Sequence, residues 1–536
     1  MTSYEQISEK VPLVTNVPLG EQIRRESRKR NIAIGVGFLA SAVVAVVLVV
    51  SLAPSSQNGN SVPILTARSS AEFGASPPGM FGDTESGKRI KRTPVVKIKQ
   101  GQLQGRIIKS RKSRDYNAFL SIPYGKPPIN DLRFEFFKDH VIYFYNPRNQ
   151  QEAGKNGFTM RHALGAFGHL STGDGLVGGN MALKDQALAF KWIRDNIEAF
   201  GGDPKRVVIF GNSSGSISVH AHLLSEMSRG LFQGAICESG VSIGPNFPEF
   251  ALKYPEIMAG ALAKELNCTD TEDSQEIVKC LKQKDVAELA NSVDTVWTLT
   301  GESVSANGDT SQMFFTDTPM NLMRKGNVAK VPIIVGVNSA EEFPNAYALL
   351  KDQASIDALN ENFASQILER KLHLPTDEPD LEREIREIYF NGSGTVTKEH
   401  RYGFTDLLSD HTFLHPSRVV GMLHSKHSPV YFYYCTKESE YTLRVDGKYD
   451  FEPPYGVGHA DEQQYLFYYY GRYPEIKPDD SRMKFSEDMI KIWVSFARDL
   501  VPDSLAVEPW NPIQETENGM VWFQLDEKPL RKSIQP

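Results

Sequence analysis

The chain has 536 residues, of which 40% are hydrophobic and 23% are charged, so a wholly disordered, collagen-like or coiled-coil protein is excluded. The formal net charge is −7, and no basic stripe with interleaved aromatic residues runs through the body of the chain, which argues against nucleic acid as a partner. Four cysteines without a paired C-x-x-C pattern predict neither a disulfide-rich scaffold nor a zinc site, and no metal is expected.

The first predicted element is a transmembrane helix over Ile32–Ala53. This run of 22 residues carries no charge, and a helix of that length can cross a hydrocarbon layer of about 30 Å. Five Lys or Arg residues stand just before it, between Arg24 and Arg30, whereas no charged residue follows until Arg68. The positive-inside rule therefore places residues 1–31 in the cytosol and the remainder of the chain in the lumen or outside the cell.

This interpretation is a single-pass signal anchor, which makes the chain a type II membrane protein. A cleaved signal peptide is the alternative, but the apolar run and the polar leader before it are both longer than is usual for one. Residues 54–93, which are rich in Ser, Gly and Pro, then predict a flexible stalk. Within the stalk, Arg89–Arg92 reads Arg-Ile-Lys-Arg and is either a processing site, with cleavage after Arg92 releasing the folded domain, or a solvated basic patch.

The motif with the most specific chemistry is the sequence Gly-Asn-Ser-Ser-Gly at residues 211–215. A β-branched apolar run, Arg206–Phe210, precedes it, and a segment with helical spacing follows it. In a G-x-S-x-G turn between a strand and a helix, the serine is held with its hydroxyl exposed, and the two glycines leave room for the sharp bend. The pattern therefore predicts Ser213 as a nucleophile and the backbone N–H of Ser214 as an oxyanion donor.

Several longer tracts accompany this motif. They are Phe119–Pro128, Ala163–Gly168, Phe200–Pro204 and Glu238–Gly240. With these tracts the sequence resembles the type-B carboxylesterase and cholinesterase family, intermittently from about Val95 to Trp510. The resemblance implies an α/β-hydrolase fold over residues 94–536, with a central, mostly parallel sheet flanked by helices. It also implies a serine ester hydrolase that acts through an acyl-enzyme and needs no cofactor.

The same resemblance implies the two partners of the serine. The family's acid follows a buried strand, here Val331–Asn338, and Glu341 occupies that place, although an offset of one residue would exchange it with Glu342. The implied base is His459, in a turn that is similar to the family's G-x-x-H-x-x-E pattern. Other histidines are interpreted as packing or surface residues, among them His220, His222, His411 and His415.

Two covalent features are expected of a domain outside the cytosol. The resemblance implies a disulfide between Cys268 and Cys280, which bracket a short loop, and an extracytoplasmic compartment would keep it oxidised. The acceptor pattern Asn-X-Ser/Thr occurs at Asn267 and Asn391 and predicts N-glycosylation of both.

One part of the family pattern is missing from the sequence. Between Phe134 and Phe158 the chain is several dozen residues shorter than the resemblance implies, and it has no glycine-rich turn to supply the main oxyanion donors. A single strand over Val141–Tyr145 is predicted there. Loss of one such donor lowers kcat by roughly 10²–10³. A real feature, an alternative splice product and an error of sequence assembly would all leave this gap.

Two functions from different classes remain. The first is a membrane-anchored hydrolase of a small-molecule carboxylic ester, with Ser213, His459 and Glu341 as its triad. The second is a catalytically impaired adhesion or receptor ectodomain, like the non-catalytic cholinesterase-like proteins, with a protein partner at the cell surface. The retained triad favours the hydrolase, whereas the missing oxyanion loop and the anchor favour the binding protein. We take the hydrolase as the prediction.

Overall fold

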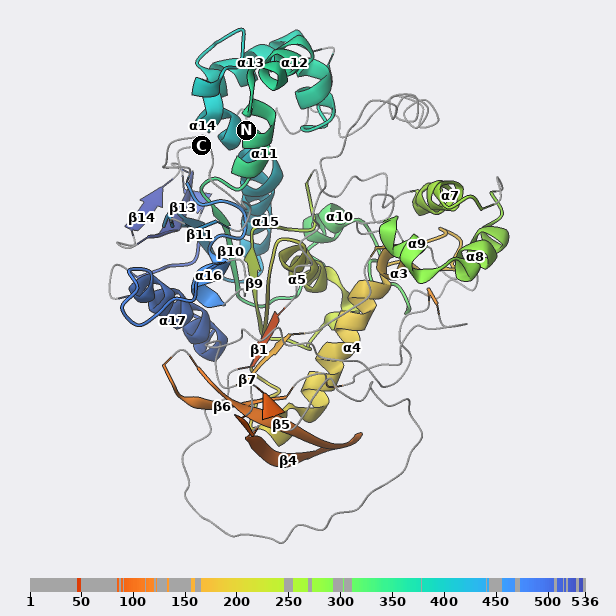
Figure 1. Cartoon of the computed structure of the whole chain (residues 1–536), viewed down its shortest axis with the longest axis vertical. Coiled ribbons are helices and arrows are strands. Elements are labelled where there is room, and N and C mark those ends of the chain that lie inside the picture. The colour runs from red at the N-terminus through yellow and green to blue at the C-terminus, as the bar shows by residue number, and fades with distance from the viewer. Residues whose placement is uncertain are drawn as a thin grey trace.

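The structure is a computed structural model, in which one central sheet has helices packed on both of its faces (Figure 1). A small separate sheet lies at one end of the molecule and a group of helices at the other. The residues that the structure describes are 46–49, 84–85, 88–89, 91–110, 112–119, 122, 133–134, 156–159, 165–244, 254–268, 272–292, 302, 311–376, 378–439, 441–442, 456–467, 473–505, 509–513, 515–516, 519–526 and 530–533.

In the described part of the chain the central sheet has nine strands, in the order β12-β13-β11-β10-β9-β8-β1-β7, with β14 beside β13. Their bounds are β1 Val46–Val49, β7 Asn156–Thr159, β8 Val207–Asn212, β9 Gly234–Glu238, β10 Ile333–Asn338, β11 Val430–Cys435, β12 Glu515–Thr516, β13 Gly519–Leu525 and β14 Leu530–Ser533. Strands β8, β9, β10, β11 and β13 pair in parallel, whereas β1 is antiparallel to both of its neighbours. Parallel strands end at one edge of a sheet, so the loops that follow them meet there.

The helices fall into three groups. Around the central sheet are α4 Met181–Asn196, α5 Ser214–Leu224, α10 Pro319–Arg324, α15 His415–Ser425, α16 Gln463–Leu466 and α17 Met483–Asp499. One lobe contains α3 Gly165–His169, α7 Pro255–Glu265, α8 Ser274–Gln283 and α9 Val286–Asn291. A second lobe, with its own apolar core, contains α11 Phe343–Leu350, α12 Gln353–Glu361, α13 Pro379–Phe390 and α14 Arg401–Ser409. Short 3₁₀ and π turns are η2 Ile197–Phe200, η3 Glu226–Ser228, η4 Ala364–Glu369, η5 Lys398–His400 and η6 Asp410–Leu414.

Strand β8 shows how the two faces of the sheet are covered. Its alternate residues Val207 and Ile209 pack in the core that contains α4 and α5, whereas Val208 and Phe210 pack in the core that contains α16 and α17. Every residue of β8, β9 and β10 is buried. Continuous apolar runs are what a parallel sheet covered on both faces requires, and the predicted α/β class is confirmed.

The separate antiparallel sheet consists of β4 Arg92–Ile98, β5 Gly101–Lys109 and β6 Asp115–Ala118. Its side chains Ile98 and Leu103 pack against the core on the α4 side of the central sheet. Two further short strands, β2 Thr84–Glu85 and β3 Lys88–Arg89, pair with each other. Regular structure is therefore present within residues 54–93, the segment predicted as a flexible stalk.

Strand β1 lies inside the apolar run that was predicted to be a membrane helix. Val46–Val49, the described residues of that run, pair with β7 on one side and with β8 on the other. The expectation of a helix is not met at these four residues, because β-branched valines suit a strand and the sheet offers hydrogen-bond partners on both sides. No helix among the described residues is both long and apolar enough to span a bilayer. The rest of Ile32–Ala53 lies outside the described residues.

Two of the four cysteines form a disulfide, and the other two are free. Cys268 and Cys280 form a disulfide that joins the end of α7 to α8, and the predicted pairing is confirmed. Cys237 on β9 and Cys435 on β11 are free and buried in the sheet.

Candidate active site

Ser213 occupies the bend between β8 and α5. Its backbone has φ 57° and ψ −123°, a conformation that costs a residue with a side chain about 1–3 kcal/mol. Hydrogen bonds hold it there, because the Ser213 N–H donates to the Glu238 carbonyl at 2.9 Å and the Ser213 carbonyl accepts from the Ile217 N–H at 3.0 Å. The bend also needs glycine beside it, since a Cβ at Gly211 would lie 2.5 Å from the carbonyl carbon of Gly215. The strained turn that the G-x-S-x-G pattern predicts is present.

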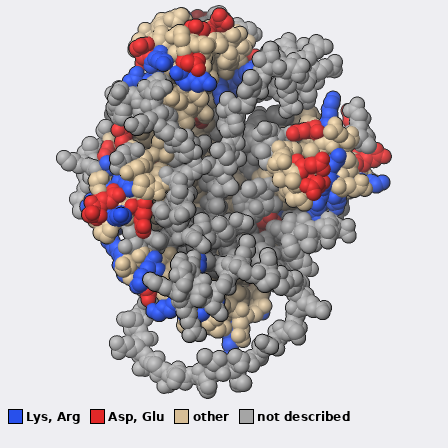
Figure 2. Space-filling model, viewed as in Figure 1, with Lys and Arg blue, Asp and Glu red and all other residues tan. Residues whose placement is uncertain are grey.

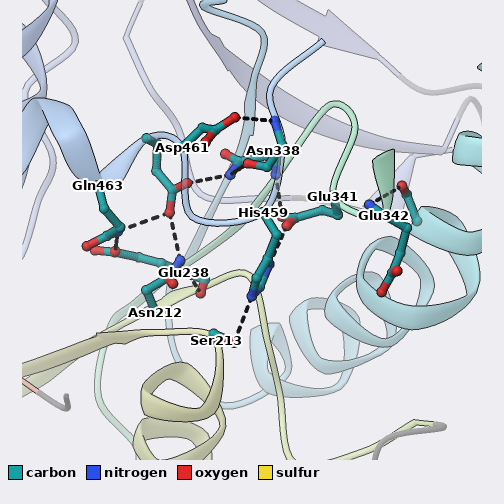
Figure 3. Close-up of polar contacts among 12 residues, drawn as sticks. Asn212, Ser213, Glu238, Asn338, Glu341, Glu342, His459, Asp461 and Gln463 are labelled. Atoms are coloured by element: carbon teal, nitrogen blue, oxygen red, sulfur yellow. Dashed lines mark hydrogen bonds and ion pairs between the residues drawn. The ribbon is translucent and has the colours of Figure 1, made fainter. Parts of the chain in front are cut away.

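Three side chains from distant parts of the chain form one hydrogen-bonded series (Figure 3). His459 Nε2 lies 2.7 Å from Ser213 Oγ, and His459 Nδ1 lies 2.6 Å from Glu341 Oε2. An ionised carboxylate only accepts, so the imidazole donates from Nδ1 and leaves Nε2 to accept the serine hydroxyl. This is the arrangement in which a histidine can take the proton of a serine nucleophile. The loops after β8 and β10 and the loop before α16 bring the three residues together.

The structure distinguishes between the two adjacent acids. Glu341 is only 2% exposed, and its second oxygen accepts from the Asn338 N–H at 2.7 Å, so both carboxylate oxygens are held in place. Glu342 points away from the imidazole (Figure 3) and accepts from the side-chain amide of Asn345. Burial raises the pKa of the Glu342 carboxyl above its usual value. Of the two, Glu341 is therefore the residue that contacts His459.

An aromatic ring packs against the histidine. Phe413 lies in the π-helical turn η6, and its ring centroid is 4.7 Å from that of His459, with the planes tilted by 34°. Single-turn π insertions in helices often mark functional sites, because they redirect a side chain. Phe413 was not predicted from the sequence, since nothing in the residues around it marks the extra residue in the helical turn.

The buried carboxyl group of Glu462 connects the three loops of the triad, and no role was predicted for it from the sequence. Glu462 accepts hydrogen bonds from the side-chain amides of Asn212 at 2.8 Å, of Gln463 at 3.0 Å and of Asn338. The first of these residues directly precedes the serine, and the last ends strand β10, just before the loop of the acid. Glu462 itself follows the histidine by three residues in the same turn. Its position in the G-x-x-H-x-x-E pattern is the signal that could have indicated it.

Glu238, at the end of β9, is a second buried carboxyl next to the first. Its Oε1 accepts from the Trp493 indole N–H at 2.5 Å, and its Oε2 accepts from the Gln463 amide, which also reaches Glu462. Burial, followed by the charge of Glu462, raises the pKa of Glu238 to about 8. Burial, followed by the charge of Glu341, raises the pKa of Glu462 to about 7. The pair therefore resists holding two negative charges at neutral pH.

The predicted oxyanion donor lies at the start of α5. Ser214 is the first residue of that helix, and the first N–H groups of a helix have no acceptor within it. The helix dipole also favours negative charge at this end. The expected gap in the oxyanion loop lies between Phe134 and Phe158, and residues 135–155 of this interval, with the predicted strand Val141–Tyr145, lie outside the described residues.

Two histidines on α5 have partners of their own away from the triad. His220 Nδ1 lies 2.6 Å from Ser242 Oγ, and burial lowers the pKa of His220 to about 3. His222 lies 2.7 Å from Ser228 Oγ and 2.9 Å from Gln186 Oε1. Both are packing residues, as predicted. Among the residues that the structure describes, no group of three or more His, Cys, Asp and Glu side chains is arranged to hold a metal ion.

Comparison with known proteins assigns the family. A model of the carboxylesterase family matches residues 92–140 and 158–535. This chain belongs to the carboxylesterase family. The juvenile hormone esterase of Tribolium castaneum is 28% identical over 508 residues, which cover 78% of this chain and 86% of that protein. The acylcarnitine hydrolase of Mus musculus is 32% identical over 378 residues, which cover 69% of this chain and 63% of that protein.

A solved structure supports the fold. The crystal structure of juvenile hormone esterase from Manduca sexta, with OTFP covalently attached, matches with a TM-score of 0.66 and 20% identity over 84% of this chain and 97% of that chain. The predicted α/β-hydrolase fold is thereby confirmed. The family match and the esterase and hydrolase names of the relatives assign this chain to the carboxylic ester hydrolases, and they do not favour a receptor. The alignment spans less than two thirds of the mouse relative.

Proposed function

We propose that this chain is a serine hydrolase that cleaves a small-molecule carboxylic ester through an acyl-enzyme intermediate. The observation that carries the proposal is the unbroken hydrogen-bond series from Ser213 Oγ through His459 to Glu341. Serine is a weak nucleophile until a base takes its proton, and the base works only if a third group holds its tautomer and orientation. An adhesion protein built on the same fold has no need of these two hydrogen bonds.

In the proposed reaction, Ser213 Oγ attacks the ester carbonyl carbon while His459 Nε2 takes the hydroxyl proton. Glu341 stabilises the imidazolium, and the Ser214 N–H donates to the developing oxyanion. The bond from carbon to the alcohol oxygen breaks, His459 returns its proton to the alcohol, and the acyl group stays on the serine. Water then attacks the acyl-serine and gives a proton to His459. The carboxylic acid leaves as the serine recovers its proton.

The test is to label the purified protein with a fluorescent fluorophosphonate, next to Ser213→Ala. Labelling of the wild type but not of the variant is the expected result, because only an activated serine reacts quickly with this probe. A screen of carboxylic esters would follow. A folded, monodisperse wild-type protein that takes no label contradicts the proposal and directs the search to a cell-surface protein partner.

We also propose that Ile32–Ala53 anchors the enzyme in a membrane, with the hydrolase domain in the lumen or outside the cell. The uncharged run of 22 residues and the five basic residues before it support this proposal. Strand β1 uses four residues of the same run, and a segment cannot be in the sheet and in a bilayer at once. Membrane fractionation tests the anchor, because an integral protein stays in the pellet after washing with alkaline carbonate. Full release into the wash contradicts it.

Processing of the domain is a further part of the proposal. Cleavage after Arg92 would detach the domain from the anchor, but the chain there is already in the small sheet, where the Ile107 N–H donates to the Lys91 carbonyl at 2.8 Å. A protease would need the start of β4 to open first. The expected glycosylation sites, Asn267 and Asn391, are both exposed next to helix ends. N-terminal sequencing of secreted protein and treatment with an N-glycosidase test these two modifications.

A further inference from the structure

The β4–β5–β6 sheet concentrates positive charge. Residues 91–119 contain nine Lys or Arg residues and one acidic residue, Asp115, which gives this segment a net charge of +8 in a chain whose net charge is −7. The rest of the chain therefore carries −15. Figure 2 shows Lys and Arg side chains at the lower end of the molecule, where Figure 1 places this sheet. Such a separation of charge creates a local positive potential on an otherwise acidic protein.

One group of these cations lies at the hairpin between β4 and β5. Lys97 and Lys99 are exposed there, and Lys97 pairs across the sheet with the exposed Gln102. Side chains opposite each other on paired strands share a face. This face therefore presents an ammonium group and an amide next to each other at one end of β5.

A second group lies at the other end of β5. Lys91 and Lys109 both pair with Asp115, at 3.1 and 2.8 Å, yet their side chains remain 71% and 67% exposed. Lys112, in the hairpin that follows, is 48% exposed and pairs with Glu487 of α17. Because two ammonium groups share one carboxylate, this end keeps a net positive charge.

Successive side chains alternate between faces, so Lys109 and Asp115 lie on the opposite face of the sheet from Lys97 and Gln102. The exposed Arg114, next to Asp115, lies on the same face as Lys97 and provides the cation at this end of that face.

The distance between the two groups indicates the shape of the partner. Strand β5 has nine residues, which at about 3.3 Å per residue separate the groups by roughly 30 Å. A compact anion would contact only one group. A linear polyanion can contact both, and the first contact raises the effective concentration for the second.

Two observations favour a polysaccharide over a nucleic acid. The aromatic residues of this segment, Tyr116 and Phe119, are both partly buried, so the sheet offers no exposed ring on which a base could stack. The disulfide between Cys268 and Cys280 indicates an oxidising compartment, where sulfated polysaccharides rather than nucleic acids are found.

We propose that the β4–β5–β6 sheet binds a sulfated polysaccharide, which runs along β5 from one basic hairpin to the other. The sulfate groups pair with the exposed Lys and Arg side chains, so binding weakens as salt is added. Helix α11, which follows the loop of Glu341, lies at the opposite end of the molecule from this sheet (Figure 1). The surface would therefore hold the protein on a polysaccharide without covering the triad, and the inference does not depend on the proposed ester hydrolysis.

Fluorescent heparin, titrated against the full chain at increasing NaCl concentration, tests the proposal. Lys97→Gln/Lys99→Gln and Lys112→Gln/Arg114→Gln each remove two charges at one end of β5. We expect each pair to weaken binding roughly tenfold and to reduce the dependence on salt, and the four changes together to abolish binding at physiological salt. The matched control, Lys264→Gln/Lys279→Gln, removes two exposed charges on α7 and α8 and should bind heparin like the wild type.

Unchanged circular dichroism spectra and unfolding temperatures show that the variants are folded. The proposal is overturned if both hairpin variants bind like the wild type, or if the control loses as much affinity as they do. Phosphatidylserine vesicles and duplex DNA complete the experiment, and we expect both to bind at least tenfold more weakly than heparin. Equal binding of either one would show a surface that responds to charge alone and would overturn the choice of a polysaccharide.

Discussion

On one side of β8 the central sheet is parallel through β9, β10, β11 and β13, and on the other side it continues through antiparallel pairs. Strands β8 to β11 run in one direction, so the ends of β8 and β10 lie at the same edge, where they present Ser213 and Glu341. Strand β1 runs the other way between β8 and β7, and its carboxyl end lies at the opposite edge. The hydrogen-bonded series of Ser213, His459 and Glu341 is therefore positioned by the parallel part of the sheet, without a contribution from β1.

The two halves of the sheet also differ in the burial and hydrogen bonds that stabilise them. In the parallel half, β8, β9 and β10 are buried throughout, and the carboxyl group of Glu462 ties the loops of the triad together. Strand β1 adds four residues to the sheet, and they belong to an apolar run that has a second possible environment in a membrane. Changes in the parallel half should therefore have large effects on chemistry, and changes at β1 small ones.

The largest expected effect is at the nucleophile. Ser213→Ala should lower ester turnover by at least about 10⁴-fold and abolish fluorophosphonate labelling, because no other group at the bend can attack. Ser213→Gly should be inactive as well, but more stable than the alanine variant by about 1 kcal/mol, since glycine adopts a positive φ without a steric penalty. Urea unfolding measures this difference. Equal stability of the two variants would show that the bend is not strained.

The two adjacent acids offer a matched comparison on the loop after β10. Glu341→Gln should lower kcat/KM by roughly 10²–10⁴, because the amide cannot stabilise the imidazolium and disturbs the tautomer. Glu342→Gln, one residue further along, should stay within about threefold of the wild type, because its side chain points away from His459. Steady-state kinetics on one ester measure both. The reverse order of effects would show that the acid contacting His459 in solution is not Glu341.

The buried carboxyl pair predicts a dependence of stability on pH. The pKa of Glu238 is raised from 4.5 to about 8, so the native state holds this proton more tightly than the unfolded state does. The stabilisation that this proton provides is complete at pH values below the pKa of Glu238 in the unfolded state. It is lost as the pH rises through the pKa of Glu238 in the folded state. The free energy of unfolding, measured in urea, should therefore fall between about pH 5 and about pH 8, and it should fall less in Glu238→Gln.

Glu384→Gln, an exposed change on α13, is the control for this experiment. It should follow the wild-type curve of unfolding free energy against pH. Identical pH dependence in the wild type and in Glu238→Gln would show that Glu238 carries no extra proton in the folded protein.

The smallest effect is expected from the loss of β1, in the antiparallel part of the sheet. Removal of residues 1–53 deletes β1, and if that run is the membrane anchor, the unfolding temperature of the domain should change by no more than about 2 °C. Differential scanning calorimetry of the shortened and full-length chains measures the change. A fall of many degrees would show that β1 is an integral strand of the sheet, and the two halves would then be equally important for stability.

The bend at Ser213 was predictable because its signal is local. A short apolar run, a G-x-S-x-G turn and a helical pattern adjoin one another in the sequence, and the strained backbone at Ser213 depends on those few residues. The pairing of Cys268 with Cys280 rested on a family resemblance and on a short loop. The parallel sheet was implied by the same resemblance, and the apolar runs of β8 and β10 were also visible in the sequence itself.

Contacts between residues that are far apart in the sequence had no local sequence signal. His459 is 118 residues from Glu341 and 246 residues from Ser213 in the sequence, and only the family resemblance related them. Nothing in the sequence marked Phe413 as a neighbour of the histidine, and the role of Glu238 depends on Trp493, which lies 255 residues away.

The amino-acid sequence alone was sufficient for the bend at Ser213 and for an apolar run long enough to cross a membrane, because each depends on the periodicity or conformational preferences of adjacent residues. The α/β class came from the family resemblance. Tertiary structure alone decided which of Glu341 and Glu342 contacts the imidazole. It also decided that two carboxyl groups share one buried site, and that Val46–Val49 form a strand next to β8. The physical reason is common to all three, since burial, hydrogen-bond partners and strand neighbours are set by residues that are distant in the chain and meet only when the sheet assembles.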